Sequence, residues 1–165
     1  MEAPKQIHPK GSADYLEVIT KAVFQSGISW KVIESKWNGF REALFGFDPE
    51  RIAELDPHDV DRLAEDTRIV RNRRKIEATI DNARTMLDLS KEHGSFKKYL
   101  RSHEDFDETV ADLKQRFRFL GDTGAYFFLH VVGEPVPSHE EWMAGREDRS
   151  TPGRRTTKPR ARTAR

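Results

Sequence analysis

Hydrophobic residues recur every three or four positions along most of the chain, which is the spacing that buries one face of an α-helix. The first apolar series lies within residues 12–27, where Ser12 is a suitable N-cap and Gly27 a suitable stop. A second series fills residues 30–46 and ends at Gly46. Two helices of about four turns are therefore predicted near the N-terminus.

Proline and glycine divide the rest of the chain into further helices. Asp48-Pro49 and Asp56-Pro57 each pair a capping side chain with a proline suited to the first helical position, which predicts two short helices. A long amphipathic helix is predicted from Thr67 to Gly94, with basic residues on its outer face: Arg71, Arg73, Arg74 and Lys75. Three more helices are predicted over residues 95–100, 106–117 and 123–132. Because no stretch alternates like a strand, the fold class is all-α, with roughly eight to ten helices.

Composition narrows the class of protein. A chain of 165 residues with 36% hydrophobic and 10% aromatic residues suits one globular domain. No apolar run approaches the ~18 residues of a membrane span, and the first ten residues lack the apolar core of a secretion signal, so a cytoplasmic protein is expected. The chain has no cysteine, and its six histidines have no ligand spacing, so neither disulfides nor a metal site is expected.

Positive charge is concentrated at the C-terminus. Residues 146–165 carry eight Lys or Arg against two acids, whereas the whole chain has a net charge of +1. We expect a disordered basic tail over 146–165, a helical domain over 13–145 and an N-terminal arm over 1–12. The tail either binds nucleic-acid phosphates or only improves solubility, and the sequence favours neither role.

A glycine turn joins two of the predicted helices at residues 117–124. Its sequence, FRFLGDTG, is typical of a helix-hairpin-helix, in which the first N–H groups of the second helix bind a DNA phosphate. The candidate DNA-binding residues are Phe119, Gly121, Thr123 and Gly124. An ordinary turn between two helices remains the alternative.

Four segments in a fixed order extend this interpretation: FQSGISW at 24–30, FDP at 47–49, IVRNRRKI at 69–76 and NAR at 82–84. Together they resemble the DNA-3-methyladenine glycosylase I family, over residues 14–135. The resemblance implies a helix-hairpin-helix DNA glycosylase fold that bends duplex DNA and rotates an alkylated base into a pocket, where its N-glycosidic bond is cleaved. It implies double-stranded DNA as the partner, a monomer and no cofactor.

The resemblance also assigns pocket residues. Trp30 matches the family's pocket tryptophan, whose ring attracts a cationic alkylated base, and Phe24 and Gln25 lie nearby; the alternative for Trp30 is a place in the core. The family's pocket glutamate falls at Ala22, so a principal polar contact is missing. The family's zinc ligands have no counterpart here.

The catalytic carboxylate must then come from elsewhere. In the wider glycosylase superfamily an aspartate lies seven positions after the glycine of a Gly-x-Pro sequence, and here Gly133-Glu134-Pro135 places Glu140 there. The alternative is that Glu140 only favours a helix N-terminus, where Ser138 and Glu141 form a capping-box pattern. Glu17 and Asp14 are weaker candidates.

Lyase-competent relatives carry a lysine in the hairpin at the position of Ala125, so the predicted enzyme is monofunctional. Two other functions stay open. Ala22 favours a catalytically silent DNA-binding or lesion-sensing protein, and the net charge of about −5 over residues 1–145 allows a partner other than DNA.

Overall fold

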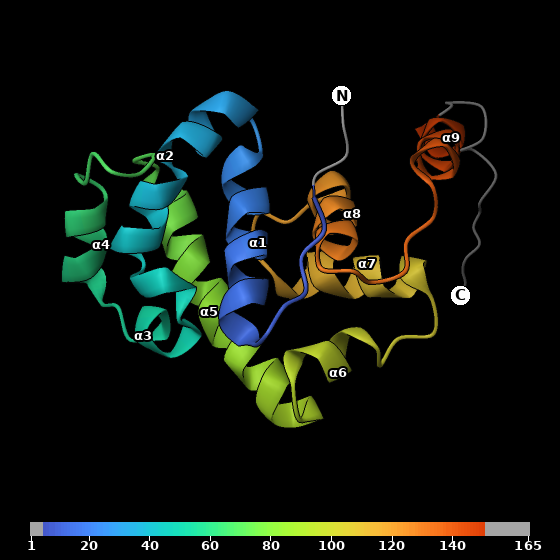
Figure 1. Cartoon of the computed structure of the whole chain (residues 1–165), viewed down its shortest axis with the longest axis horizontal. Helices are drawn as coiled ribbons and strands as arrows, with labels where there is room; N and C mark the ends of the chain where they lie inside the picture. Colours follow the sequence, from blue (N-terminus) through green and yellow to red (C-terminus); the bar gives the residue numbers. More distant parts are fainter. Residues whose placement is uncertain (1–4, 151–165) are drawn as a thin grey trace, which may run out of the picture. The chain divides into compact units, whose positions relative to one another are not determined.

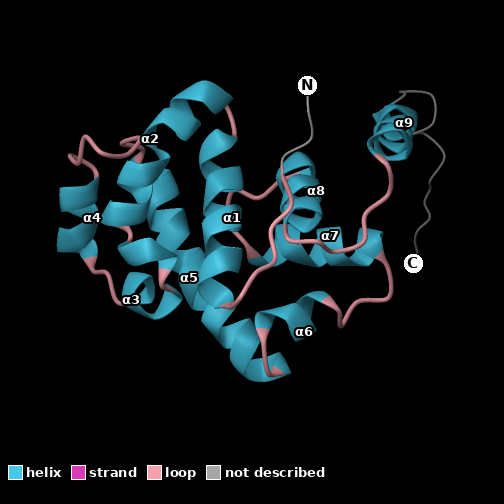
Figure 2. Cartoon of the chain, in the orientation of Figure 1, coloured by secondary structure: helices cyan, strands magenta, loops and turns pink. Residues whose placement is uncertain are grey.

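The fold is entirely helical, as predicted. In the computed structural model, residues 5–150 are described, except the side chains of 147–150, and this part contains nine α-helices, one 3-10 turn and no strand (Figures 1 and 2). The elements are α1 (Ser12–Gln25), α2 (Trp30–Ala43), η1 (Phe45–Phe47), α3 (Pro49–Ala53), α4 (Pro57–Leu63), α5 (Arg73–His93), α6 (Phe96–Leu100), α7 (Phe106–Arg116), α8 (Asp122–Val131) and α9 (His139–Ser150). The all-α fold class is confirmed.

The chain divides into two compact units, which we describe separately. The first comprises residues 1–135 and the second begins at Val136, where α9 is the described helix. Helix α9 continues to Ser150 and so overlaps the first residues of the predicted tail. Ser138 and Glu141 cap this helix reciprocally, with both N–H to side-chain bonds formed, so the predicted capping box is confirmed. The remainder of the predicted tail, 151–165, lies outside the described residues.

Helix α1 lies in the middle of the first unit, between α5 and α8 (Figure 1). The apolar positions that predicted it are fully buried: Leu16, Ile19, Val23 and Phe24. The predicted cap is wrong, because Gly11 occupies the N-cap and Ser12 is the first helical residue. The segment before α1 is tied to α8, since Ile7 N donates to Val131 O at 2.7 Å.

The two Asp-Pro signals start helices as predicted. Asp48 accepts a hydrogen bond from the N–H of Glu50, and Asp56 accepts one from Asp59 in a reciprocal capping box. Arg84, in the NAR segment, donates from Nε to Ala53 O at 3.0 Å. This bond satisfies a carbonyl at the end of α3 and fixes α3 against α5.

The long helix begins later than predicted, at Arg73 rather than Thr67. The Asp66 carboxylate accepts hydrogen bonds from both the backbone and the guanidinium of Arg68, which closes a turn instead of a helix. Asn72 then caps α5 by accepting from Lys75 N at 3.2 Å. Local side-chain bonds to the backbone therefore compete with the helix over residues 66–72.

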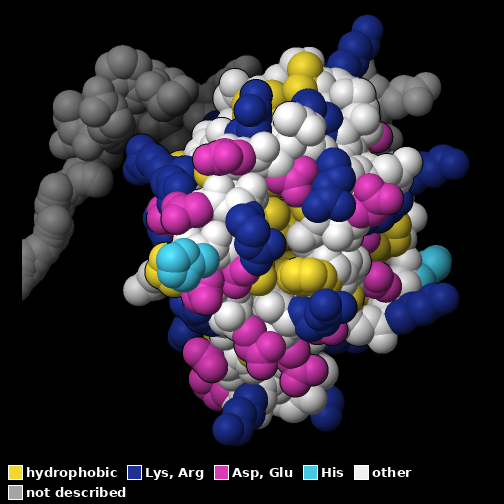
Figure 3. All heavy atoms as spheres, turned by 90° about the vertical axis from the view of Figure 1, so that its left-hand side faces the viewer, with side chains coloured by type: hydrophobic (Ala, Val, Ile, Leu, Met, Phe, Trp, Pro, Cys, Tyr) yellow, Lys and Arg dark blue, Asp and Glu magenta, His cyan; other side chains and the backbone are white. Residues whose placement is uncertain are grey.

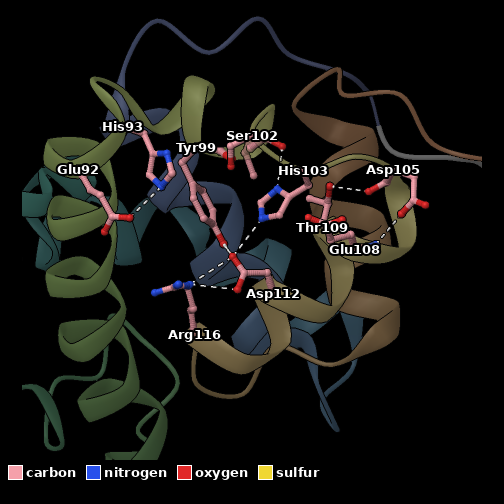
Figure 4. Close-up of polar contacts among 11 residues, drawn as sticks. Glu92, His93, Tyr99, Ser102, His103, Asp105, Glu108, Thr109, Asp112 and Arg116 are labelled. Atoms are coloured by element: carbon pink, nitrogen blue, oxygen red, sulfur yellow. Dashed lines mark hydrogen bonds and ion pairs between the residues drawn. The ribbon is translucent and has the colours of Figure 1, made fainter.

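A polar network joins α6 to α7 (Figure 4). The Tyr99 hydroxyl donates to Asp112 Oδ2 at 2.7 Å, His103 Nε2 lies 3.0 Å from the same oxygen, and Arg116 Nε donates to Oδ1 at 3.1 Å. Burial alone would raise the pKa of the Asp112 carboxyl, but the hydrogen bonds from its three partners together outweigh burial. The pKa of Asp112 therefore lies below its usual value. Burial, reinforced by the Asp112 hydrogen bond, raises the pKa of Tyr99.

This network predicts an acid-sensitive contribution to stability. The folded pKa of Asp112 lies below the unfolded value of about 3.9, so its contribution is complete above that pH and is lost as the pH falls through the folded pKa. Asp112→Asn should lower the free energy of unfolding by about 1–3 kcal/mol at pH 7, and by progressively less below about pH 4. Denaturant titrations across pH measure this, with the exposed Asp88→Asn as control. A loss independent of pH would contradict the assignment.

Candidate functional site

The junction between α1 and α2 carries an exposed tryptophan. Trp30 is the first residue of α2, and 48% of its surface is exposed. Trp37, two turns later in the same helix, is only 4% exposed and stacks on Phe40 and Phe47. The alternative that Trp30 is a core residue is therefore wrong, and Trp37 has that role.

A buried lysine fixes the end of α1. Lys75 of α5 donates from Nζ to Ser26 O at 2.5 Å and lies 3.4 Å from Phe24 O. The cation satisfies carbonyls at the helix C-terminus, where the helix dipole also favours positive charge. Burial lowers the pKa of Lys75. The prediction that Lys75 lies on the outer face of its helix is wrong, whereas Arg71, Arg73 and Arg74 are exposed.

The other predicted pocket residues have different surroundings. Phe24 is fully buried, with its ring 4.8 Å from that of Phe40 in an edge-on contact, so it belongs to the core and presents no face to a ligand. Gln25 is partly buried, and its Nε2 has no hydrogen-bond partner among the described residues. Ala22 faces α8, because a Cβ at Gly124 would lie 3.5 Å from the Cβ of Ala22.

Lys21 is part of the same junction, although the sequence pattern did not single it out. Its Nζ lies 5.4 Å from the ring centre of Trp30 and 5.2 Å from that of Trp37, and it forms an ion pair with Glu34 of α2. Lys21 precedes Gln25 by four residues, so the two side chains share a helix face. That spacing was the available signal, but the lysine looks like an ordinary surface residue without its partners.

The second candidate region is the connection between α7 and α8. Phe117 and Leu120 are buried, whereas Phe119 between them is 37% exposed and has a φ of +60°, which non-glycine residues rarely adopt. Arg74 lies over the Phe119 ring, 5.5 Å from its centre. The turn thus presents an aromatic ring and a guanidinium at the surface.

Asn82 of α5 holds this turn in place. Its Oδ1 accepts a hydrogen bond from Arg118 N at 2.8 Å, and its Nδ2 donates to Arg118 O at 3.2 Å. Asn82 is only 1% exposed, so the oxygen and the nitrogen of its side-chain amide both form hydrogen bonds away from solvent. The NAR segment of the sequence therefore supports the turn through Asn82 and the end of α3 through Arg84.

Helix α8 begins without a side-chain cap. Gly121 is its N-cap residue and no side-chain cap hydrogen bond is formed there, while Thr123 is exposed. The N–H groups of Thr123 and Gly124 precede the first hydrogen bond within the helix, from Ala125 N to Gly121 O, and lie at the positive end of the dipole, which suits an anion. Gly124 leaves room for close packing, because a Cβ there would lie 3.1 Å from Leu120 Cδ1.

Substitution of Asn82 tests the turn. Asn82→Ala leaves both peptide groups of Arg118 without their partners, so the free energy of unfolding should fall by about 2–4 kcal/mol. The affinity for duplex DNA should also fall, even at temperatures where the variant stays folded. Thermal unfolding and fluorescence anisotropy measure the two effects, with Arg84→Ala as a variant of the same helix that keeps both bonds to Arg118. Full DNA affinity in a destabilised Asn82→Ala protein would separate the turn from DNA binding.

The carboxylates proposed for catalysis lie in different places. Glu140 is exposed in the first turn of α9 and belongs to the second unit, so it is described there alone. Glu17 accepts hydrogen bonds from Trp37 Nε1 at 2.8 Å and from Arg41 Nε at 2.7 Å. Its carboxylate therefore links α1 to α2. Asp14 accepts from Lys10 N at the start of α1.

Charge is intermixed on the face shown in Figure 3, where basic and acidic side chains alternate and neither sign covers a broad area. Among the described residues, no three His, Asp or Glu side chains are arranged to hold a metal ion. Within the same residues, no helix is both long and apolar enough to cross a membrane.

Comparisons with known proteins give one result. Residues 8–116 match the methyladenine glycosylase family. The chain is 29% identical to the DNA-3-methyladenine glycosylase of Haemophilus influenzae over 130 residues, which cover 66% of this chain and 70% of that protein. It is also 29% identical to DNA-3-methyladenine glycosylase 1 of Escherichia coli over 143 residues, covering 74% and 76%.

A similar fold has been solved. The structure of 3-methyladenine DNA glycosylase I from Staphylococcus aureus, determined to explain its recognition of 3-methyladenine, superposes with a TM-score of 0.69 at 28% identity. The match covers 78% of this chain and 80% of that one. Both sequence and fold therefore relate the chain to the same group of proteins.

Proposed function

This chain belongs to the methyladenine glycosylase family, and we propose that it acts as a monofunctional DNA glycosylase in base-excision repair. It rotates an alkylated base of the 3-methyladenine kind out of the duplex and hydrolyses its N-glycosidic bond. The relatives and the S. aureus structure are proteins of this activity by name.

The exposed ring of Trp30 is the observation that carries this proposal. A tryptophan with half its surface in solvent is available for stacking. Trp30 is the first residue of α2, so the helix sets where its ring lies. An alkylated adenine is cationic while attached to the sugar, so an electron-rich ring attracts it by about 0.5–2 kcal/mol. We assign Trp30 as the stacking surface, and we keep Ala22 and Gln25 of α1 as pocket positions because the resemblance places them there.

The turn between α7 and α8 binds the DNA backbone in this proposal. Phosphate oxygens accept hydrogen bonds from the first N–H groups of α8, at Thr123 and Gly124, while Phe119 lies against the backbone. Such contacts position the duplex without reading its sequence. Trp30 and the turn between α7 and α8 belong to the same compact unit.

The chemistry needs little acid catalysis, because a cationic base leaves as a neutral molecule. The C1′–N bond breaks with its electron pair going to the base, a water oxygen bonds to C1′, and a carboxylate takes the water's proton. We assign Glu140 to this role. No amine attacks the sugar in the hairpin, because position 125 holds a fully buried alanine, and the enzyme is therefore monofunctional.

Single-turnover release of base from methylated duplex DNA tests the assignment of Glu140. Glu140→Gln should reduce the rate at least about tenfold without changing DNA affinity, because it removes the proton acceptor. Glu104→Gln, an exposed residue of the first unit, is the matched control. Equal rates for the two variants would exclude Glu140 while leaving the glycosylase proposal intact.

Ala22 favours a second candidate function, that of a DNA-binding protein that senses lesions without cutting. In that case duplex binding would fall steeply with salt as phosphate contacts are screened, and no base would be released. Base release excludes this candidate. Its absence, together with salt-sensitive binding, would establish it.

We further propose that the enzyme works as a monomer in the cytoplasm, on nucleoid DNA, and that its basic C-terminal segment adds phosphate contacts. Deleting residues 151–165 should weaken duplex binding at low salt and flatten its salt dependence, because fewer counterions are released. The melting temperature should not change. Anisotropy titrations at several salt concentrations measure the effect, and an unchanged affinity would show that the segment takes no part.

A further inference from the structure

We propose that Lys21 is a specificity-determining residue that shifts the site away from cationic bases and toward neutral purines with a carbonyl edge. The inference rests on the proposed function, because it concerns the bases that stack on Trp30. It follows from a cation beside the Trp30 ring, at Lys21, and an unpaired amide donor one helical turn later, at Gln25.

The cation lies against the stacking surface. Lys21 Nζ is 5.4 Å from the Trp30 ring centre and 5.2 Å from that of Trp37, so the ammonium already occupies the attractive field of both rings. A cationic base on Trp30 would have to approach this charge. Glu34 compensates only in part, because this ion pair is partly exposed, with 26% of the Lys21 side chain and 44% of the Glu34 side chain in solvent.

A second donor lies one helical turn after Lys21, at Gln25. Gln25 shares the helix face of Lys21 and Ala22, and its buried Nε2 has no hydrogen-bond partner among the described residues. A buried donor without a partner is costly, and a ligand acceptor would satisfy it.

The two donors, the Lys21 ammonium and the Gln25 amide, match a base that bears a carbonyl oxygen. Hypoxanthine, the neutral deamination product of adenine, has such an oxygen where adenine has an amino group. When a neutral base leaves, the C1′–N electron pair makes it an anion, and water supplies the hydroxyl group to C1′ and a proton to the base. The ammonium of Lys21 stabilises the negative charge that develops on this leaving group.

The test compares single-turnover release of 3-methyladenine and hypoxanthine from duplexes and follows the ratio of the two rates. Lys21→Met removes the positive charge and leaves Glu34, so the ratio should move toward 3-methyladenine by about tenfold. Glu34→Gln leaves the lysine uncompensated, and the ratio should move the opposite way. Lys21→Arg keeps the charge and should keep the ratio.

A purely structural role for Lys21 would change both rates together and leave the ratio constant, which overturns the inference. Shifts of the same sign in Lys21→Met and Glu34→Gln also overturn it. Release of 3-methyladenine without any hypoxanthine would overturn the inference and leave the proposed function standing. If the unsubstituted protein releases neither base, both are wrong.

Discussion

Replacing Trp30 with alanine should slow release of the alkylated base roughly 10- to 100-fold, because stacking on an aromatic side chain is worth about 1–3 kcal/mol per base. The residue is 48% exposed, so its removal leaves the core intact and the melting temperature should change little. Duplex affinity should also persist, since the phosphate contacts lie at the α7–α8 turn. The measurement is single-turnover base release alongside anisotropy with undamaged DNA.

Two further variants sharpen this result. Val32→Ala removes another exposed apolar side chain from the same helix and should leave base release unchanged. Trp30→Phe keeps a stacking ring and should recover part of the rate. If Trp30→Ala and Val32→Ala behave alike, the stacking surface lies elsewhere.

Gly39→Ala should destabilise the protein strongly. Gly39 lies within α2 where the helix crosses the chain at Arg68, and a Cβ at this position would be 2.2 Å from the Arg68 carbonyl oxygen. Backbone atoms cannot rotate away as a side chain can, so α2 or the turn at residues 66–72 must move. We expect the free energy of unfolding to fall by at least about 2–3 kcal/mol.

Gly11→Ala is the control for the Gly39 substitution. Its φ of −178° is open to any residue, and an added Cβ has no atom within 4 Å, so the loss should stay below about 1 kcal/mol. Denaturant titrations of both variants measure the two losses in the free energy of unfolding. A Gly39→Ala protein as stable as Gly11→Ala would mean that α2 does not approach Arg68 this closely.

Helix periodicity and capping residues could be predicted from the sequence, because they depend on near neighbours. Asp48, Asp56 and the Ser138–Glu141 pair each cap the helix expected of them. The start of α5 could not be predicted, because the side chains of Asp66 and Asn72 accept hydrogen bonds from the backbone that compete with helix formation. Propensity over residues 67–72 gave no sign of that competition.

The candidate site was only partly predictable, because the sequence does not show which side chains the packing of other helices covers. Trp30 and Phe24 both looked like pocket aromatics, yet one is exposed and the other has no exposed surface. Lys75 belongs to a run of basic residues, but its ammonium is buried at the end of α1. The contacts of Lys21 could not be predicted, because they depend on the packing of α2, which supplies Trp30, Trp37 and Glu34.

The most direct test of the central claim is the identity of the base that the purified full-length protein releases from methylated double-stranded DNA, determined by chromatography. We predict time-dependent release of 3-methyladenine, with strand breaks appearing only after alkali because the enzyme leaves abasic sites intact. Salt-sensitive DNA binding with no release of any base would contradict the claim and identify the protein as a silent binder of the same fold.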